Sequence, residues 1–455
     1  MLYLSPDKTT KVHFLMKRIL LIAAALLVCV AAWGQSFLES VTLSLDKGEE
    51  GVYAVGEPIK VFAESEIDAP AIVKVYINGN LNNAWRTDLS AGGKTEVFNA
   101  SYDKPLALMV RLSNLKDEKD STTVGAVVAP EQLKPGFDEP ADFAKFWGKQ
   151  LKTMRKMKMK TRLTPVAVPE KYEGKFVCYD LEINCVGNVP VRGYLAMPVD
   201  AKPRSLPIAI YAHSAGKLTK RWTRSTVDRA IKMAKYGNGA IGLDINAHGM
   251  LNDQPEEYYA DLQEKLNGYS GWPIVDHENY YFRTMFLRMV RALDYLCTLK
   301  QWDRKKVLVT GGSQGGAQSA ALAGLDKRVT HVVVDVPAMW DTGGCLLGRT
   351  SGWPKPIEHN KDNPEAARVA SYYDGAVFLR HFKGELFVNV GLIDLTCPPA
   401  SVWSAFNVCP ASHKEIHPCA WKGHSGKYSL PEAPRAEVKI GMDKKIDEAI
   451  DRFLK

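Results

Sequence analysis

The stretch VLVTGGSQGGAQSAALAGL, residues 307–325, runs from a β-branched apolar segment through glycines around one serine into an alanine-rich segment. Within it, GGSQG (311–315) matches the pattern G-x-S-x-G, and its flanks predict a strand before it and a helix after it. A turn this tight holds the serine in a strained backbone conformation, and side chains at the flanking positions would collide. The stretch therefore predicts a strand–turn–helix that presents Ser313 as a nucleophile, and not a flexible loop with an idle serine.

From about residue 175 the chain alternates short apolar runs with helical segments. The runs expected to be strands buried on both faces are LPIAIYAH, GAIGLDIN, KVLVTGG, HVVVDVPA and ELFVNVGL. Between them, residues 281–299 carry apolar side chains at helical spacing. This alternation predicts a doubly wound, mostly parallel α/β sheet over residues 131–455, interrupted by two insertions at 249–280 and 340–372.

Residues 35–130 differ in pattern and predict a second, smaller domain. Segments such as IKVFAES and LALMVRLSN alternate apolar and polar residues between turn signals, which is typical of a small all-β sandwich. A proline-rich segment at 129–140 marks the boundary, and 455 residues suit two domains. Because Trp85 is its only tryptophan, a structural role for the sandwich is favoured over a carbohydrate-binding module, and both interpretations stay open.

The N-terminus carries a predicted targeting segment. MKRILLIAAALLVCVAAWGQ (16–35) has a basic start, an apolar core and small residues at its end, as secretory signal peptides do. We therefore expect residues 1–34 to be a signal-peptide region with the true start at Met16 and Gln35 as the first mature residue. The protein is then exported to the periplasm or the cell exterior, and no apolar run predicts a stable membrane span.

Charge and cysteine content exclude several classes of protein. The formal charge is +8, but four basic residues against one acidic fall within residues 1–34, and the remaining excess is spread along the chain. The densest run, KTMRKMKMKTR (152–162), is typical of a solvated helix face, so no nucleic-acid partner is expected. The seven cysteines beyond the signal region have no zinc spacing, which predicts buried free thiols and no metal site.

A serine nucleophile needs a base and an acid, and chain order suggests both. His424 follows the predicted last strand and precedes the C-terminal helix, whereas its rival His417 lies within that strand. Asp394 lies just beyond a buried strand, where a carboxylate can orient the histidine. Its rival, Asp335, lies one strand earlier, inside an apolar run. The favoured set is Ser313, Asp394 and His424.

Two backbone amides are expected to form an oxyanion hole, one at Gln314 and one in HSAG (213–216), where Ser214 is the favoured donor. His213 and His248 also stand at strand ends and are candidate pocket residues. SAGKLT superficially resembles a phosphate loop, but it lacks the first glycine and the hydroxyl residue directly after Lys217, so no nucleotide cofactor is predicted.

Several stretches beyond the turn resemble carbohydrate esterase family seven, the acetyl xylan esterases and cephalosporin C deacetylases, over residues 136–455. They are DFAKFW, YYFRTMFLRMVRALDY, GGSQGG, DVPA, SYYDG and GLIDLTCPPASVWSAFN. The resemblance implies the α/β-hydrolase fold and a metal-free enzyme that removes acetyl groups from sugars and small alcohols, often assembled as a hexamer. No cofactor is expected. The resemblance also implies the same roles for Ser313, Asp394, His424, Ser214 and Gln314.

The chain departs from that family in three turns. HSAG (213–216) replaces a Gly-Tyr-Asn-Gly-like turn, NAHG (246–249) replaces Arg-Gly-Gln-Gly, and Ser425 replaces the usual glutamate after the base. The first two line the acyl and alcohol pocket, so they leave the substrate preference open. The expected function is a secreted serine esterase acting on acetylated xylan or oligosaccharides as a homo-oligomer; a secreted serine peptidase and an inert glycan-binding protein are the alternatives.

Five aromatic residues in the two insertions have two interpretations. They either stack on sugar rings near the pocket mouth or pack the insertions onto the body of the domain, and packing is favoured. These residues are Tyr258, Tyr259, Tyr269, Trp272 and Trp353.

Overall fold

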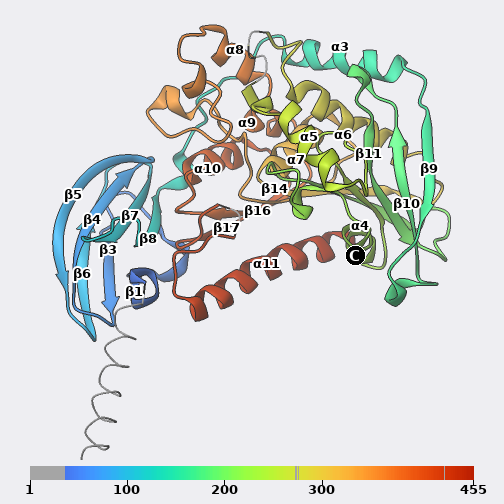
Figure 1. Cartoon of the computed structure of the whole chain (residues 1–455). Helices are drawn as coiled ribbons and strands as arrows, with labels where there is room; N and C mark the ends of the chain where they lie inside the picture. Colours follow the sequence, from blue (N-terminus) through green and yellow to red (C-terminus); the bar gives the residue numbers. More distant parts are fainter. Residues whose placement is uncertain (1–35, 272–273, 275, 425) are drawn as a thin grey trace, which may run out of the picture.

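The computed structural model describes residues 36–271, 274, 276–424 and 426–455. The predicted signal peptide, Trp272 and Ser425 lie outside the described residues. A small strand-rich unit lies beside a larger α/β unit, and the C-terminal helix runs beneath the larger one (Figure 1). Among the described residues, no helix combines the length and the apolar character that crossing a bilayer requires.

The N-terminal unit consists of two sheets that enclose one apolar core, in agreement with the predicted sandwich. Alternate side chains of its strands point into that core, as the burial of every second residue in β1 and β3 shows. One sheet orders β1 (Val41–Leu45), β3 (Ile59–Ser65) and β6 (Gly93–Ala100). The other orders β2 (Val52–Tyr53), β8 (Ser121–Val128), β7 (Leu106–Asn114), β4 (Ala69–Ile77) and β5 (Asn80–Leu89). A single helical turn, α2 (Phe37–Ser40), precedes β1.

The α/β unit is built on one nine-stranded sheet, which confirms the predicted fold class. Its order is β17-β16-β15-β14-β12-β13-β11-β10-β9; the six strands from β17 to β13 are parallel, and the other three are antiparallel. The strands are β9 (Thr161–Val166), β10 (Phe176–Ile183), β11 (Val191–Pro198), β12 (Leu206–Ala212), β13 (Ile241–Ile245), β14 (Trp302–Gly312), β15 (His331–Asp335), β16 (Glu385–Gly391) and β17 (His413–Cys419).

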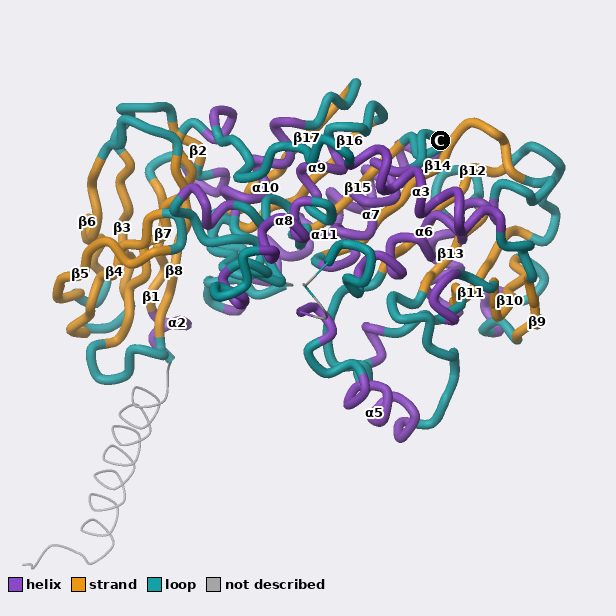
Figure 2. The backbone as a smooth tube through the Cα atoms, turned by 90° about the horizontal axis from the view of Figure 1, so that it is seen from above, coloured by secondary structure: helices purple, strands orange, loops and turns teal. Residues whose placement is uncertain are grey.

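Helices cover both faces of this sheet, which explains why its central strands are mostly apolar on both faces (Figure 2). Val307 and Val309 of β14 share a core with α6 and α7, whereas Leu308 shares one with α4 and α11 on the opposite face. The helices are α3 (Phe143–Lys156), α4 (Val227–Lys235), α5 (Glu256–Lys265), α6 (Phe282–Leu296), α7 (Gln314–Leu325), α8 (Glu365–Ser371), α9 (Gly375–Leu379), α10 (Pro399–Val408) and α11 (Glu432–Leu454).

Three elements differ from the sequence expectations. Strand β5 was not predicted because its side chains are mostly exposed and carry no apolar alternation. The sequence predicts the C-terminal helix over GMDKKIDEAIDRFL (441–454), but α11 begins at Glu432. The pattern misses the first half of this helix because that half is mostly exposed and polar. The basic run 152–162 is helical only as far as Lys156, and β9 begins at Thr161. The seven described cysteines are free thiols, as expected.

The sandwich contacts the loops that follow β16 and β17. The amide of Gly125 in β8 donates to the carbonyl of Ala420 over 2.8 Å, and the indole N–H of Trp421 donates to the carbonyl of Leu43 over 2.6 Å. A β-carbon at Gly125 would lie 2.4 Å from the carbonyl oxygen of Leu392, so this strand packs backbone against backbone on the α/β unit. The N-terminal unit therefore braces both loops.

Candidate active site

Ser313 stands between the end of β14 and the start of α7 in a conformation that few residues adopt. Its φ is 51° and its ψ is −121°, a strained combination for a residue with a side chain. Its amide donates to the carbonyl of Asp335 in the neighbouring strand over 3.0 Å, which fixes the turn. The predicted strand–turn–helix is therefore present, with the serine at its apex.

The glycines of this turn are needed because β12 presses against it. A β-carbon at Gly311 would lie 2.5 Å from the carbonyl oxygen of Ala212, and one at Gly315 would lie 2.2 Å from the same oxygen. Both distances are shorter than any tolerated contact, and the clashing atom is backbone. Positions 311 and 315 therefore need glycine because β12 lies so close to the turn from β14 into α7.

The three residues favoured from sequence lie in one hydrogen-bonded row. The Oγ of Ser313 lies 3.0 Å from Nε2 of His424, and Nδ1 of the same ring lies 2.8 Å from Oδ2 of Asp394. A carboxylate only accepts hydrogen bonds, so Nδ1 donates to Asp394 and Nε2 is left to accept the serine proton. The imidazole is 21% exposed and the carboxylate is fully buried, so the base faces solvent while its partner does not.

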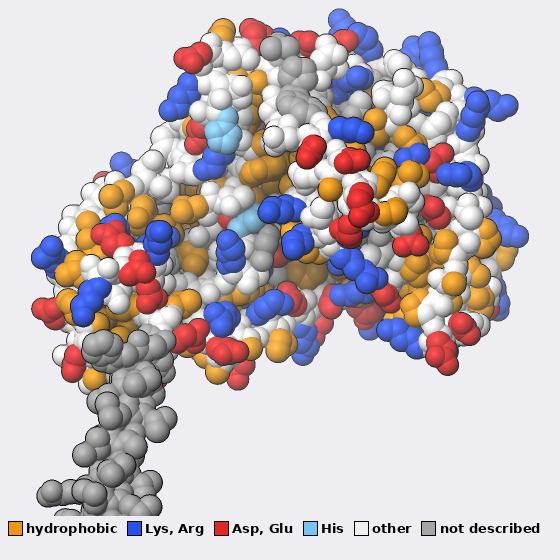
Figure 3. Space-filling view, viewed as in Figure 1, with side chains coloured by type: hydrophobic (Ala, Val, Ile, Leu, Met, Phe, Trp, Pro, Cys, Tyr) orange, Lys and Arg blue, Asp and Glu red, His pale blue; other side chains and the backbone are white. Residues whose placement is uncertain are grey.

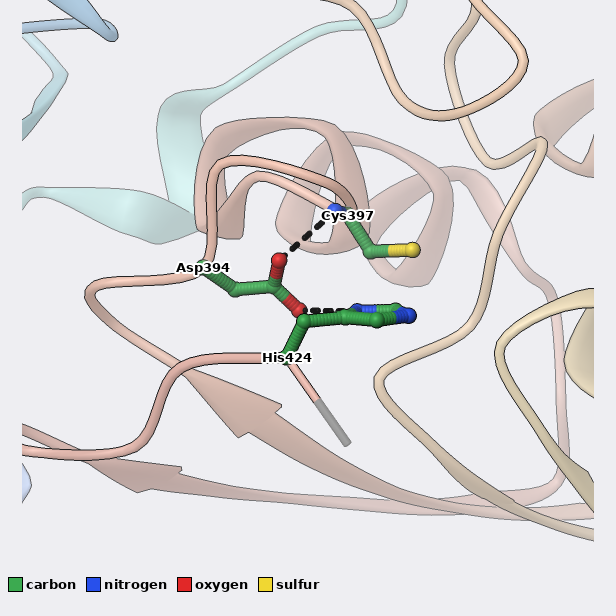
Figure 4. Close-up of side chains that lie close together, drawn as sticks. All are labelled: Asp394, Cys397 and His424. Atoms are coloured by element: carbon green, nitrogen blue, oxygen red, sulfur yellow. Dashed lines mark hydrogen bonds and ion pairs between the residues drawn. The ribbon is translucent and has the colours of Figure 1, made fainter. Parts of the chain in front are cut away.

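The Asp394 carboxylate is held on its other oxygen by the turn that follows β16. Its Oδ1 accepts the amides of Thr396 and Cys397 over 2.8 and 2.9 Å. Figure 4 shows this turn bringing the Cys397 side chain beside the imidazole ring of His424. Sequence reasoning did not single out Cys397, because its position depends on the turn around Asp394.

Asp394, Cys397 and His424 are the one group of three metal-capable side chains found in the described part of the chain, with ligand atoms within 4.8 Å of one another. Their donor atoms already have partners, since both ring nitrogens and both carboxylate oxygens are hydrogen-bonded. Burial and the neighbouring carboxylate raise the pKa of the Cys397 thiol well above its usual range, which disfavours the thiolate that metals bind. The hydrogen-bonded row accounts for this cluster without a metal.

The two rival residues occupy other places. Asp335 pairs with Lys422, with 2.7 Å between Oδ1 and Nζ, and its carbonyl holds the amide of Ser313. His417 lies in β17, stacks on Phe387 at 4.6 Å between ring centroids, and lies 3.4 Å from a carboxylate oxygen of Glu415.

The two proposed oxyanion amides stand beside Ser313. Ser214 follows β12, and its hydroxyl donates to the carbonyl of Gly312 over 2.9 Å, which ties this turn to the serine's own turn. Gln314 is the first residue of α7, where helix amides point outward. Within the described residues, neither amide donates to a protein acceptor, so both are available to an oxyanion.

The two candidate pocket histidines are both buried. His213 has no exposed surface; its Nδ1 lies 3.1 Å from the Trp222 carbonyl and its Nε2 lies 2.6 Å from Asp244. The ring is thus held inside the protein and not presented to a substrate. His248 is 7% exposed, and its Nδ1 lies 2.8 Å from the hydroxyl of Tyr281.

The insertion at 249–280 reaches the nucleophile turn through Tyr269. Its hydroxyl donates to the side-chain carbonyl of Gln314, and its ring lies 4.7 Å from the ring of His248 between centroids. Tyr258 and Tyr259 instead pack within the insertion, in a separate apolar cluster. The side-chain contact at Gln314 was not predicted, because only its amide was considered.

Comparisons with known proteins identify relatives of this chain. Residues 131–435 match the family model described as acetyl xylan esterase. The chain is 34% identical over 334 residues to the acetyl esterase Axe7A of Xylanibacter ruminicola, covering 71% of this chain and 72% of that protein.

Two solved structures share the fold. An acetyl xylan esterase from Paenibacillus sp. has a TM-score of 0.56 at 24% identity, covering 70% of this chain and 98% of that one. Acetyl xylan esterase 1 from Thermoanaerobacterium sp. has a TM-score of 0.54 at 21% identity, covering 70% and 97%.

Proposed function

Because this chain belongs to the acetyl xylan esterase family and is a carboxylic ester hydrolase, we propose that it removes acetyl groups from acetylated xylan or oligosaccharides through an acyl-enzyme on Ser313. The observation that carries the mechanism is the row of hydrogen bonds Ser313–His424–Asp394 at 3.0 and 2.8 Å. It supplies a nucleophile, a base and an orienting carboxylate in one line.

In the first step, Nε2 of His424 takes the proton from Ser313 while Oγ attacks the acetyl carbonyl. The negative charge that forms on the carbonyl oxygen is stabilised by the amides of Ser214 and Gln314. Asp394 stabilises the charged imidazolium and keeps Nδ1 protonated. His424 then protonates the departing sugar hydroxyl, and the acetyl group remains on the serine.

In the second step, water replaces the sugar alcohol. His424 removes a proton from water, which attacks the acyl-enzyme, and the same two amides hold the second oxyanion. Acetate leaves as His424 returns the proton to Ser313, which restores the starting state. In both steps the protons move only among Ser313, His424, the sugar alcohol and water.

Acetate release from acetylated xylan, with a matched peptide amide as a second substrate, tests this proposal. Ser313→Ala is expected to lower kcat by about four to six orders of magnitude. Ser319→Ala is the matched control, since its hydroxyl only bonds a carbonyl within α7. Acetate release by Ser313→Ala at the wild-type rate would falsify the mechanism, and preferential cleavage of the amide would reassign the protein as a peptidase.

Export and homo-oligomerisation are also proposed, on the sequence and its family resemblance alone. The segment 16–35 supports export because it has the charge and apolar pattern of a signal peptide. Mass spectrometry of the mature protein is expected to find Gln35 as the first residue. Light scattering on the purified protein gives the number of subunits, and a monomer would contradict the oligomer.

A further inference from the structure

A cavity of about 690 Å³ lies beside the nucleophile turn, between α4 and α11. Thr310 and Gly312 of β14 form part of its wall, and so does the side chain of Ser214. The cavity therefore extends to the residue directly before Ser313 and to a proposed oxyanion donor. Figure 3 shows a recess in the middle of this face, with Lys and Arg side chains gathered around it.

Three carboxylates line the cavity, and a lysine neutralises each of them. The pairs are Asp335–Lys422 at 2.7 Å, Asp447–Lys232 at 2.9 Å and Asp443–Lys439 at 2.6 Å. Asp447 also accepts the hydroxyl of Tyr236 over 2.5 Å. The acidic residues therefore leave little net negative charge to repel an anion.

Arg229 of α4 adds a positive charge that no carboxylate neutralises. Its guanidinium lies 4.2 Å above the centroid of the Tyr211 ring, a cation–π contact that orients it without neutralising it. No ion pair joins it to any carboxylate among the described residues, and the side chain is only half-buried. The guanidinium of Arg229 is held in one orientation and has no carboxylate partner among the described residues. It is therefore suited to bind a planar carboxylate in the cavity through two parallel hydrogen bonds.

The other lining residues suit a sugar ring. Tyr236 presents aromatic surface, and Trp222, at 53% exposure, stands at the solvent side. Aromatic faces pack against the C–H faces of pyranoses while polar groups hold their hydroxyls. A sugar ring that carries a carboxylate would pack against the aromatic side chains and pair with Arg229.

We propose that this cavity binds a uronate residue of the acetylated glycan, with Arg229 pairing with its carboxylate, while an acetyl group on a neighbouring sugar reaches Ser313. This site rests on the proposed deacetylase function and narrows its substrate to acidic, acetylated saccharides. Because Ser214 and Gly312 line the cavity and also lie beside Ser313, one glycan can fill the cavity with its uronate and reach Ser313 with an acetyl group on the neighbouring sugar.

Acetate release from two acetylated xylo-oligosaccharides, one neutral and one with a single glucuronate branch, tests the site. Wild type is expected to show about tenfold higher kcat/KM for the branched substrate, a preference of about 1.4 kcal/mol. Arg229→Gln is expected to abolish the preference, Arg229→Lys to keep part of it, and both to leave 4-nitrophenyl acetate turnover unchanged. Raising NaCl from 20 to 500 mM is expected to reduce the wild-type preference.

Arg221→Gln is the matched control, because this exposed arginine lies in the turn before α4 but outside the cavity lining. It is expected to retain the full preference. Equal kcat/KM for the two substrates in wild type, or a preference that survives Arg229→Gln, overturns the proposal. A melting temperature close to wild type shows that Arg229→Gln is folded; if it is not, Arg229→Lys decides.

Binding measurements separate this site from the proposed reaction. Calorimetry with Ser313→Ala is expected to show about tenfold tighter binding of the deacetylated glucuronate oligosaccharide than of its neutral counterpart, and Ser313→Ala/Arg229→Gln is expected to lose it. If no acetylated saccharide is hydrolysed but this difference in affinity remains, the deacetylase assignment fails and the uronate site stands. If hydrolysis occurs without any difference in affinity, the uronate site fails alone.

Discussion

The ammonium of Lys422, whose side chain is only 2% exposed, lies 2.7 Å from the carboxylate of Asp335, two residues before the proposed base His424. Burial alone would lower the pKa of Lys422, but the Asp335 carboxylate outweighs it and raises the pKa above its ordinary value, so the lysine stays charged. The Asp335 carbonyl holds the amide of Ser313, and the Lys422 carbonyl accepts the amide of Ile393 over 3.2 Å. The ion pair thus joins Asp335 to the loop of His424, and the two backbone hydrogen bonds link this pair to the turns of Ser313 and Asp394.

Lys422→Met is expected to lower kcat for 4-nitrophenyl acetate about tenfold with little change in KM, because the loop of His424 loses its anchor. It also leaves the Asp335 carboxylate unpaired, which is expected to destabilise the fold by about 2 kcal/mol given its partial exposure. Asp335→Asn in the same chain is expected to recover the stability but not kcat. Lys427→Met, on the exposed side of the loop, is the control. Unchanged kcat in Lys422→Met would show that the pair has no positioning role.

The triad candidates were predictable from sequence because each depends on local context. Ser313 and Asp394 follow apolar strands, His424 follows the last strand before the C-terminal helix, and the carboxyl ends of parallel strands meet at one edge of a sheet. The Lys422–Asp335 pair was not predictable, since its members lie 87 residues apart in the sequence. The burial of His213 was not predictable for a related reason, because strand-end position does not tell whether a side chain points into the core.

The structural role of the sandwich was not predictable from the sequence either. Its strands follow from alternation, but its contacts with the loops of Asp394 and His424 join residues about 300 positions apart, which no local pattern reports. These contacts support the structural role that was favoured because Trp85 is the only tryptophan of the sandwich. That structural role is to hold the loops that carry the proposed acid and base.

Gly125→Ala in β8 tests this bracing. The new methyl group would lie 2.4 Å from the Leu392 carbonyl oxygen, so the strand and the loop before Asp394 must separate. We expect a loss of about 1–3 kcal/mol in the free energy of unfolding and a tenfold or larger fall in kcat. Gly148→Ala is the control, since nothing lies within 4 Å of a β-carbon in that exposed helical position, and it is expected to gain up to about 1 kcal/mol. Wild-type kcat in a folded Gly125→Ala variant would argue against the brace.

The Cys397 thiol is expected to resist alkylation despite its position beside the proposed base. The side chain is 1% exposed, and burial and Asp394 raise its pKa well above the usual range, so little thiolate forms at pH 8. Incubation with iodoacetamide is expected to leave esterase activity intact, with Cys397 unmodified in peptide mass spectra. Urea-unfolded protein is the control and is expected to be fully alkylated. Rapid inactivation of the native enzyme with a label on Cys397 would contradict this expectation.

His248 is expected to make stability depend on pH in the acid range. Burial, with a smaller contribution from Arg288, lowers the pKa of His248 to about 3, against about 6.5 in the unfolded chain. Between these values the unfolded state binds one more proton than the folded state, so the free energy of unfolding falls as pH drops from about 6.5 towards 3. The single proton of His248 can change the free energy of unfolding by at most about 1.4 kcal/mol per pH unit. Urea unfolding of wild type and His248→Asn at pH 7, 6, 5 and 4 measures the difference in slope, and His413→Gln, at an exposed histidine, is the control. Parallel slopes for wild type and His248→Asn would mean that His248 takes up its proton in the folded state as readily as in the unfolded chain.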